Sequence, residues 1–146
     1  MPIRITRLDD SVPLPAYHSA DAAAFDLAAR EPVVVPAGAV RLVPTGLVIE
    51  VPVDHALLIL ARSSLPLKKQ LMVANGVGLI DADYRGPDDE IKVEVYNFST
   101  GPVTIERGER IAQGLFVKIA RVEWEQADAA SSPSRGGFGS TGGYDG

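Results

Sequence analysis

Alternating apolar and polar residues predict that most of the chain forms short β-strands. In residues 90–97, Ile91, Val93 and Val95 alternate with the polar Lys92 and Glu94, which is the period of a strand with one buried face. The other expected strands are 33–35, 40–43, 47–51, 56–60, 103–105 and 115–122. Many short strands joined by turns predict an all-β fold of the antiparallel sandwich, jelly-roll or barrel type.

Turns with recognisable chemistry separate these strands. Proline, glycine and aspartate mark turns at 36–38, 44–46, 52–54 and 107–109 because these residues favour turn conformations. Residues 65–73 are the one stretch expected to form a helix, with Pro66 in its first turn and Lys68, Lys69 and Gln70 on its solvent side.

The composition changes at about residue 127. Residues 127–146 consist mainly of Gly, Ser, Ala and Asp, and their only aromatic residues are Phe138 and Tyr144. Such a segment buries too little apolar surface to fold alone. We therefore expect a β-domain over residues 1–126, followed by a flexible glycine-rich tail over residues 127–146.

Composition and charge exclude several classes of protein. The chain has 146 residues and no cysteine, so it forms neither disulfides nor thiolate metal sites, and a reducing compartment fits. The first ten residues contain no apolar run of signal-peptide length, and no stretch is long enough to span a membrane. We therefore expect a cytoplasmic protein. The net charge of −5, with both signs mixed, argues against binding a nucleic-acid polymer but allows a small anion held by arginines.

The two histidines, His18 and His55, are far apart in the sequence and have no ligand-like neighbours. We expect surface or packing roles for both of them.

Residues 75–86 carry the densest chemistry. Asn75 and Gly76 favour the positive φ angles of a tight hairpin. The apolar run that follows is broken by Gly78, as in a strand that a ligand approaches closely. Asp81 and Tyr84 come directly after this run. A loop that begins at a buried strand holds its polar groups in fixed positions, as a functional site requires.

Three other stretches in the β-domain carry candidate groups. Asp26 lies between apolar neighbours, which alone indicates a turn or a structural ion pair. Arg62 precedes two serines at the start of the expected helix, a pattern that suits either a phosphate cradle or an ordinary serine N-cap. Arg110 is a candidate partner for a buried carboxylate, and Gln113 is a candidate hydrogen-bond donor.

The tail carries a fourth group. Arg135, Phe138, Ser140 and Thr141 lie on a glycine-rich backbone, which can wrap closely around an anion. A frayed terminus or a linker is the alternative, but a neutral linker needs neither the guanidinium nor the ring.

In this order, these stretches resemble the five motifs of the trimeric deoxyuridine triphosphatases (dUTPases). The matching segments are 23–27, 61–65, 75–86, 108–113 and 136–142. The resemblance implies a β jelly-roll homotrimer with active sites shared between subunits. It also implies Mg²⁺-dependent hydrolysis of dUTP to dUMP and pyrophosphate, which lowers dUTP and supplies dUMP for thymidylate synthesis.

The resemblance also implies a role for each nucleoside-binding residue. Asp81 orients and deprotonates the water that attacks the α-phosphorus, and an exposed aspartate is ionised at neutral pH. Asn75, Gly78 and Leu79 bind uracil with the backbone of residues 76–79. Tyr84 lies against the deoxyribose and excludes a 2′-hydroxyl. Phe138 closes over the uracil when the tail orders.

The phosphates have their own implied residues, which are Arg62, Ser63, Ser64, Gln113, Arg135, Gly137, Ser140 and Thr141. Direct protein ligands to Mg²⁺ are not expected, because this ion keeps several waters and binds phosphate oxygens. Asp26 and Gln113 are implied to approach it only through water. Asp83 and Arg85 are expected in structural or intersubunit ion pairs.

Three features depart from the family pattern. Pro133 occupies the usual place of the tail arginine, and Arg135 instead stands three residues before Phe138. Residues 87–89 resemble an insertion after the third motif, and we expect an exposed loop or bulge there. Phe25 replaces the usual tyrosine of the first motif and lacks its hydroxyl.

Two other functions are compatible with the same scaffold. A dCTP deaminase typically has a catalytic glutamate near the third motif and lacks the glycine-rich phenylalanine tail, whereas this chain has Asp81 and the tail. A non-catalytic nucleotide-binding protein would be favoured by loss of Asp81 or Tyr84, and both are present.

Overall fold

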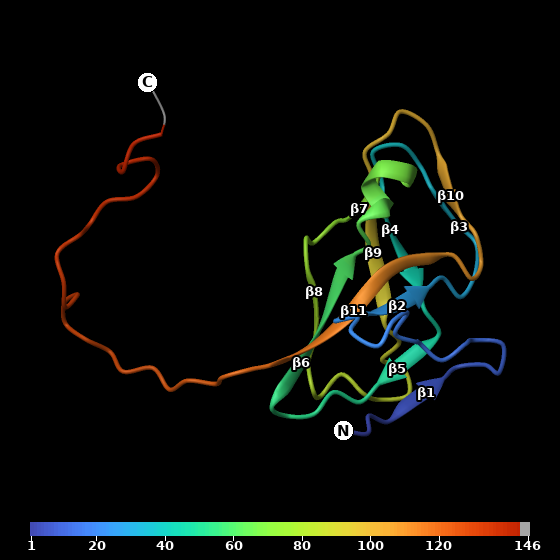
Figure 1. The fold of residues 1–146 in the computed structure, drawn as a ribbon, viewed down its shortest axis with the longest axis horizontal. Coiled ribbons are helices and arrows are strands. Elements are labelled where there is room, and N and C mark those ends of the chain that lie inside the picture. Colours follow the sequence, from blue (N-terminus) through green and yellow to red (C-terminus); the bar gives the residue numbers. More distant parts are fainter. Residues whose placement is uncertain (144–146) are drawn as a thin grey trace.

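The computed structural model describes residues 1–143, so Tyr144 and the rest of the predicted tail end lie outside the described residues. The described chain forms a β-sandwich with one short helical segment (Figure 1). In chain order the elements are β1 (Ile5–Arg7), β2 (Phe25–Ala28), β3 (Val33–Val35), β4 (Val40–Pro44), β5 (Leu47–Ile49), β6 (His55–Ala61), η1 (Leu65–Lys69), β7 (Leu71–Val73), β8 (Gly78–Ile80), β9 (Lys92–Asn97), β10 (Val103–Ile105) and β11 (Arg110–Lys118).

The strands form two larger sheets and two strand pairs. One sheet has the order β2-β11-β6-β8, the other has the order β4-β9-β7, and β1 pairs with β5 and β3 with β10. All of these pairings are antiparallel. Leu57 of β6 and Val95 of β9 are both fully buried, because alternate residues of each strand point into one core. The all-β prediction is confirmed.

The strand predicted from alternation at residues 90–97 is largely confirmed. Ile91, Val93 and Val95 are at most 1% exposed, and β9 begins at Lys92. Glu90 precedes the strand and is buried.

The predicted helix over residues 65–73 is correct only in its first half. η1 is a π-helical segment with Pro66 at its start, and it ends at Lys69, directly before the C-cap residue Gln70, which has φ 52°. Leu71 and Val73 are buried whereas Met72 is exposed. This period of two belongs to a strand, and β7 accordingly pairs with β9.

Two other boundaries differ from the prediction. β11 starts at Arg110 and ends at Lys118, so the predicted strand at 115–122 begins too late and ends too late. The start of β11 was missed because residues 110 and 113 are polar. The strand ends at Lys118 because its pairing with β6 also ends there. β1 and β2 were not predicted as strands, and both are short.

The predicted turns are present. Gly38, Gly46 and Gly108 all have φ between 71° and 80°, a conformation that glycine adopts without steric cost. His55 follows the turn at 52–54, is 9% exposed, and lies 2.7 Å from Asp54 through Nδ1 and Oδ1. This hydrogen bond lowers the pKa of Asp54, and the packing role predicted for His55 is confirmed.

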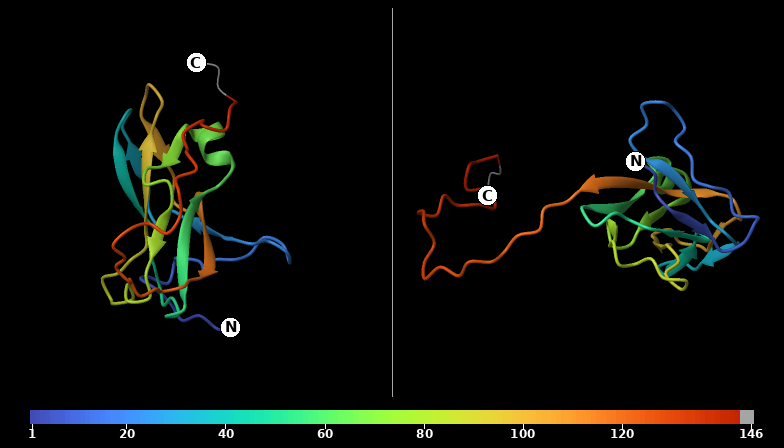
Figure 2. Two further views of the ribbon diagram at one scale, coloured as in Figure 1. Left: turned by 90° about the vertical axis from the view of Figure 1, so that its left-hand side faces the viewer. Right: turned by 90° about the horizontal axis from the view of Figure 1, so that it is seen from below.

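The chain leaves the sandwich after β11 and runs away from it (Figures 1 and 2). All described residues from 119 onward are exposed, and Trp124 is 94% exposed. The tail's own backbone hydrogen bonds are two local turns, from Ser140 to Gly137 and from Gly142 to Gly139. Among the described residues there is no helix of the length and apolarity that a membrane span requires.

Candidate active site

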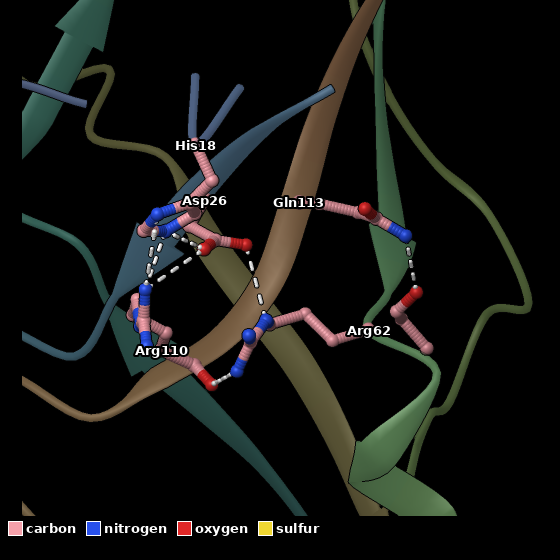
Figure 3. A network of polar contacts seen from close by, with 6 residues as sticks. His18, Asp26, Arg62, Arg110 and Gln113 are labelled. Carbon is pink, nitrogen blue, oxygen red and sulfur yellow. Dashed lines mark hydrogen bonds and ion pairs between the residues drawn. The ribbon is translucent and has the colours of Figure 1, made fainter. Parts of the chain in front are cut away.

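The carboxylate of Asp26 lies among basic side chains on the outer face of β2 (Figure 3). Its Oδ1 lies 3.0 Å from Arg62 Nε. Its Oδ2 lies 2.5 Å from His18 Nε2 and 3.5 Å from Arg110 Nη1. The Asp26 side chain is only 13% exposed, so this charge is held in place by partners on both oxygens. The predicted structural ion pair is confirmed, whereas the turn is wrong because Asp26 lies within β2.

Sheet register brings these distant residues together. Gln113 of β11 pairs with Asp26 on one side and with Leu60 of β6 on the other. Its Nε2 donates to the carbonyl of Ala61 at 2.9 Å. Arg62 follows directly after β6 and donates from Nη1 to the carbonyl of Arg110 at 3.1 Å. The side chain of Arg62 is therefore anchored both to β2 and to β11.

His18 belongs to the same cluster, which the sequence did not indicate. Tyr17 packs edge-on against Phe25, with ring centroids 5.7 Å apart, and this contact carries the neighbouring His18 to Asp26. Nε2 of His18 faces Oδ2 of Asp26, so the imidazole is one of the groups around this carboxylate. Arg110 also contacts this imidazole and donates from Nη1 to Asp26 Oδ2 at 3.5 Å. A cavity of about 260 Å³ beside the cluster is lined by both residues.

The two serines keep their hydroxyls free of helix capping. Ser64 stands at the N-cap of η1, with φ −84° and ψ −14°, but makes no side-chain capping hydrogen bond. A capping serine normally has extended backbone angles. The N-cap prediction is therefore right about the position and wrong about the hydrogen bond. Ser63 is exposed beside it.

A second candidate region lies at the end of β8. A groove of about 390 Å³ is lined by Leu42, Leu79, Ile80, Asp81, Tyr84, Glu90 and Lys92. Asp81 is exposed, and within residues 1–143 its side chain makes no hydrogen bond or ion pair. The hydroxyl of Tyr84 donates to the carbonyl of Glu90 at 2.9 Å. Asp83 and Arg85, expected in ion pairs, form none within the described part of this chain.

The Asn75-Gly76 turn is present, but it does not close a hairpin. Gly76 has φ 74°, and Val77 donates its N–H to the carbonyl of Asn75 at 2.8 Å. The strands on either side belong to different sheets, since β7 pairs with β9 and β8 pairs with β6. A Cβ at Gly78 would lie 3.0 Å from Ile59. The absence of a side chain at Gly78 therefore leaves room for the buried Ile59 side chain of β6.

The structure places the predicted residues of the β-domain in two separate groups, one at β2 and one at β8. β2 and β8 are the two edges of one four-stranded sheet, about 14 Å apart at three interstrand spacings. No hydrogen bond or ion pair within the described residues joins Asp26 to Asp81. The tail residues Arg135, Gly137, Phe138, Ser140 and Thr141 are exposed, and the tail segment runs away from the sandwich (Figure 1).

Known proteins are similar to this chain in sequence and in fold. A family model described as dUTPase matches residues 10–142. The deoxyuridine 5′-triphosphate nucleotidohydrolase of Rickettsia akari (strain Hartford) is 41% identical over 145 residues, which cover 96% of each chain. The chain belongs to the dUTPase family. A dUTPase crystal structure from Streptococcus mutans, 34% identical, matches with a TM-score of 0.77 over 85% of this chain and 100% of that chain.

A Staphylococcus bacteriophage 80alpha dUTPase with dUpNHpp has the same fold. It is 23% identical, and its TM-score is 0.86 over 97% of this chain and 98% of that chain. Of the dUTPase motif residues, Asp26, Arg62 and Gln113 meet in one cluster, whereas Asp81 and Tyr84 meet at another.

Two of the departures from the dUTPase pattern, Phe25 and residues 87–89, lie in the described part of the chain with clear contacts. Phe25 is 4% exposed and fills the space above Gly114, where a Cβ would lie 2.4 Å from the ring. Residues 87–89, which were predicted to be an insertion, belong to a turn in which Asp89 Oδ2 accepts a hydrogen bond from Gly86 N–H at 2.7 Å. The loop predicted at the insertion is confirmed.

Proposed function

We propose that this protein is a dUTP diphosphatase that hydrolyses dUTP to dUMP and pyrophosphate, lowering dUTP and supplying dUMP for thymidylate synthesis. The family match over residues 10–142 is the observation that carries this proposal. The chemistry of the two residue groups supports it, because one offers cations for phosphates and the other offers an exposed carboxylate beside a tyrosine.

Asp81 is the proposed general base. Its carboxylate is exposed and makes no ion pair within residues 1–143, so it remains available to orient a water and accept its proton. The water attacks the α-phosphorus in line with the departing pyrophosphate. Asp26 is a poor base by contrast, because Arg62, His18 and Arg110 already engage its two oxygens.

The basic cluster is the proposed phosphate-binding half of the site. Phosphoryl transfer depends mainly on positioning and on neutralising charge. Arg62 supplies a guanidinium in a fixed orientation, and the hydroxyls of Ser63 and Ser64 are not used for helix capping. Gln113 adds an amide from β11. The tail residues proposed to complete this shell are Arg135, Gly137, Ser140 and Thr141.

The outer edge of β8 is the proposed uracil-binding half. Among the described strands, β8 pairs only with β6, so the N–H and C=O groups on its other side lack a strand partner. Such groups alternate along an edge and match the donors and acceptors of uracil. Asn75, Gly78 and Leu79 contribute to this edge. Tyr84 is proposed to exclude a 2′-hydroxyl, and Phe138 to close over the base.

Magnesium is the proposed cofactor. Within the described residues no three His, Cys, Asp or Glu side chains gather as a metal site, and both oxygens of Asp26 have protein partners. This arrangement fits an ion held mainly by triphosphate oxygens and water, with Asp26 and Gln113 in contact only through water. When bound, Mg²⁺ neutralises phosphate charge.

We also propose a homotrimer whose active sites are shared between subunits. An apolar row crosses the outer face of the three-stranded sheet, where Val40 and Met72 flank Tyr96. Val40 and Met72 are each 44% exposed, and Leu42 beside them is 56% exposed. Exposed apolar surface of this kind favours association. Light scattering should give three times the 15.5 kDa mass of the chain, and a monomer mass would contradict the proposal.

The function is tested by pyrophosphate release from dUTP, UTP, dTTP and dCTP, each with and without Mg²⁺. The proposal predicts rapid release from dUTP with Mg²⁺ and far slower release from the other three. Ammonia release from dCTP would instead indicate a deaminase. Binding of dUTP without any release would indicate a non-catalytic protein.

A further inference from the structure

Tyr84 is tied to the body of the protein through its hydroxyl group. This O–H donates to the backbone carbonyl of Glu90 at 2.9 Å, so the side chain spans the loop of residues 85–89. The residue is 38% exposed and lines the groove beside Asp81. The hydrogen bond therefore fixes the far end of an aromatic ring that is otherwise accessible to a ligand.

Glu90 presents that carbonyl from a fixed position. The residue is 9% exposed, and its Oε1 accepts hydrogen bonds from the Gly46 N–H at 2.8 Å and from Arg30 Nη1 at 3.3 Å. Ile91, the next residue, donates its N–H to the carbonyl of Leu47 at 2.9 Å. Glu90 is thus held by its own side chain and by the backbone that follows it.

The intervening turn is closed by Asp89. Its N–H donates to the carbonyl of Gly86 at 3.1 Å, and its Oδ2 accepts from the Gly86 N–H at 2.7 Å. A Cβ at Gly86 would lie only 3.1 Å from the same oxygen. Asp88, in the same turn, is exposed and makes no side-chain hydrogen bond or ion pair within residues 1–143.

We propose that Asp89 is a positioning residue for sugar selection, acting through Tyr84. By closing the turn, Asp89 sets the separation between the backbone of Tyr84 and the carbonyl of Glu90, and so sets the position of the ring. This inference rests on the role of Tyr84 against the deoxyribose in the proposed function. It assigns a purpose to the inserted residues 87–89, which provide the carboxylate that closes the turn.

The selectivity follows from the stiffness of the ring. A ring fixed at both ends cannot retreat from a 2′-hydroxyl, so UTP must clash or bind in a displaced position. A ring released at its hydroxyl end can move, and displacements of about 1 Å are enough to change discrimination at a site. Loss of the Asp89 contact should therefore weaken the preference for dUTP over UTP without removing the catalytic groups.

The test measures kcat and KM for dUTP and for UTP in wild-type protein and in the variants Asp89→Ala, Asp89→Asn, Tyr84→Phe and Asp88→Ala. Asp89→Ala and Tyr84→Phe should each lower the ratio of kcat/KM for dUTP to that for UTP by roughly 3- to 10-fold, the range for one lost hydrogen bond. Asp89→Asn retains an acceptor oxygen and should keep a ratio close to that of wild type. Asp88→Ala should leave the ratio and the turnover of dUTP unchanged.

A double variant separates positioning from a general loss of structure. If Asp89 acts through the Tyr84 hydroxyl, the variant Tyr84→Phe/Asp89→Ala should lose no more selectivity than Tyr84→Phe alone. Additive losses would overturn the inference, as would an unchanged ratio in Asp89→Ala protein that hydrolyses dUTP. Wild-type protein that does not hydrolyse dUTP would overturn the proposed function instead, and the inference with it.

Discussion

Asp26 and Asp81 are both motif aspartates, but their surroundings differ in almost every respect. The Asp26 side chain is 13% exposed and has Arg62, His18 and Arg110 as partners. Asp81 is exposed at the rim of a groove, without an ion pair in the described part of the chain. A carboxylate surrounded by cations holds other groups in place, whereas an unpartnered carboxylate can accept a proton.

The two regions also differ in what they lack. The Asp26 cluster has cations for phosphates and no group suited to bind a base or a sugar. The groove has a tyrosine, a strand edge and a free carboxylate, but Lys92 is its only basic side chain. The regions lie at opposite edges of one sheet. In the proposed function each region is half of a nucleotide site, and a second copy of the chain supplies the other half.

The substitution Asp81→Asn tests the difference between the two aspartates with the largest expected effect. Removing the proposed base should lower turnover of dUTP by about 10³-fold, while a non-hydrolysable dUTP analogue still binds with nearly normal affinity in calorimetry. Asp83→Asn, two residues away and also exposed, is the matched control and should retain most of the activity. Near-full activity in Asp81→Asn would remove Asp81 as the base.

Arg62→Ala tests the other region. It removes the guanidinium that lies 3.0 Å from Asp26 and should lower kcat/KM for dUTP by about 10²-fold, the usual cost of one preorganised donor. Arg62→Lys keeps the charge but loses the two-pronged geometry, so it should recover only part of the loss. Full recovery by lysine would show that charge alone matters here.

Truncation after Ser132 tests whether the tail joins the two regions. Loss of Arg135, Phe138 and the tail hydroxyls should slow turnover by roughly 10- to 100-fold because the substrate is less well positioned. The melting temperature should not change, since the described tail makes no hydrogen bond to the sandwich. The single substitution Phe138→Ala should reproduce part of the effect. An undiminished rate in the truncated protein would leave these residues without a role.

His18→Ala is expected to have the smallest effect. The His18 side chain is 58% exposed, and exposed ion pairs contribute about 0–1 kcal/mol to stability. Asp26 keeps both arginines in this variant, so thermal unfolding should change little. A loss of stability comparable with that of an Asp26→Asn variant would show that the imidazole, rather than the arginines, holds the carboxylate.

The sequence predicted the strands best where alternation was regular and long. Ile91, Val93 and Val95 alternate with polar residues, and all three are buried. The pattern failed at 65–73, where a short helical segment and a three-residue strand lie end to end and each is too short to show its own period. The alternation pattern also missed the start of β11 at Arg110, because the first residues of this strand include polar ones.

The sequence predicted which residues belong to the candidate site, but not how they are arranged in space. The Asn75-Gly76 dipeptide specifies a turn, yet the choice of strand partners depends on contacts distant in sequence, and β7 and β8 joined different sheets. Gln113 and Asp26 meet only through the register of β11 with β2. The place of His18 beside Asp26 was not predicted, because the contact between Tyr17 and Phe25 that positions it has no local signature.

The central claim is that one nucleotide site takes Arg62 from one copy and Asp81 from another. Equal amounts of the impaired variants Arg62→Ala and Asp81→Asn can be unfolded, mixed and refolded together, and then assayed for pyrophosphate release from dUTP. Random assembly places both intact residues in about one quarter of the sites, so the mixture should recover about a quarter of the wild-type rate. A mixture no more active than its separate components would show that a single copy supplies both residues, and would contradict the claim.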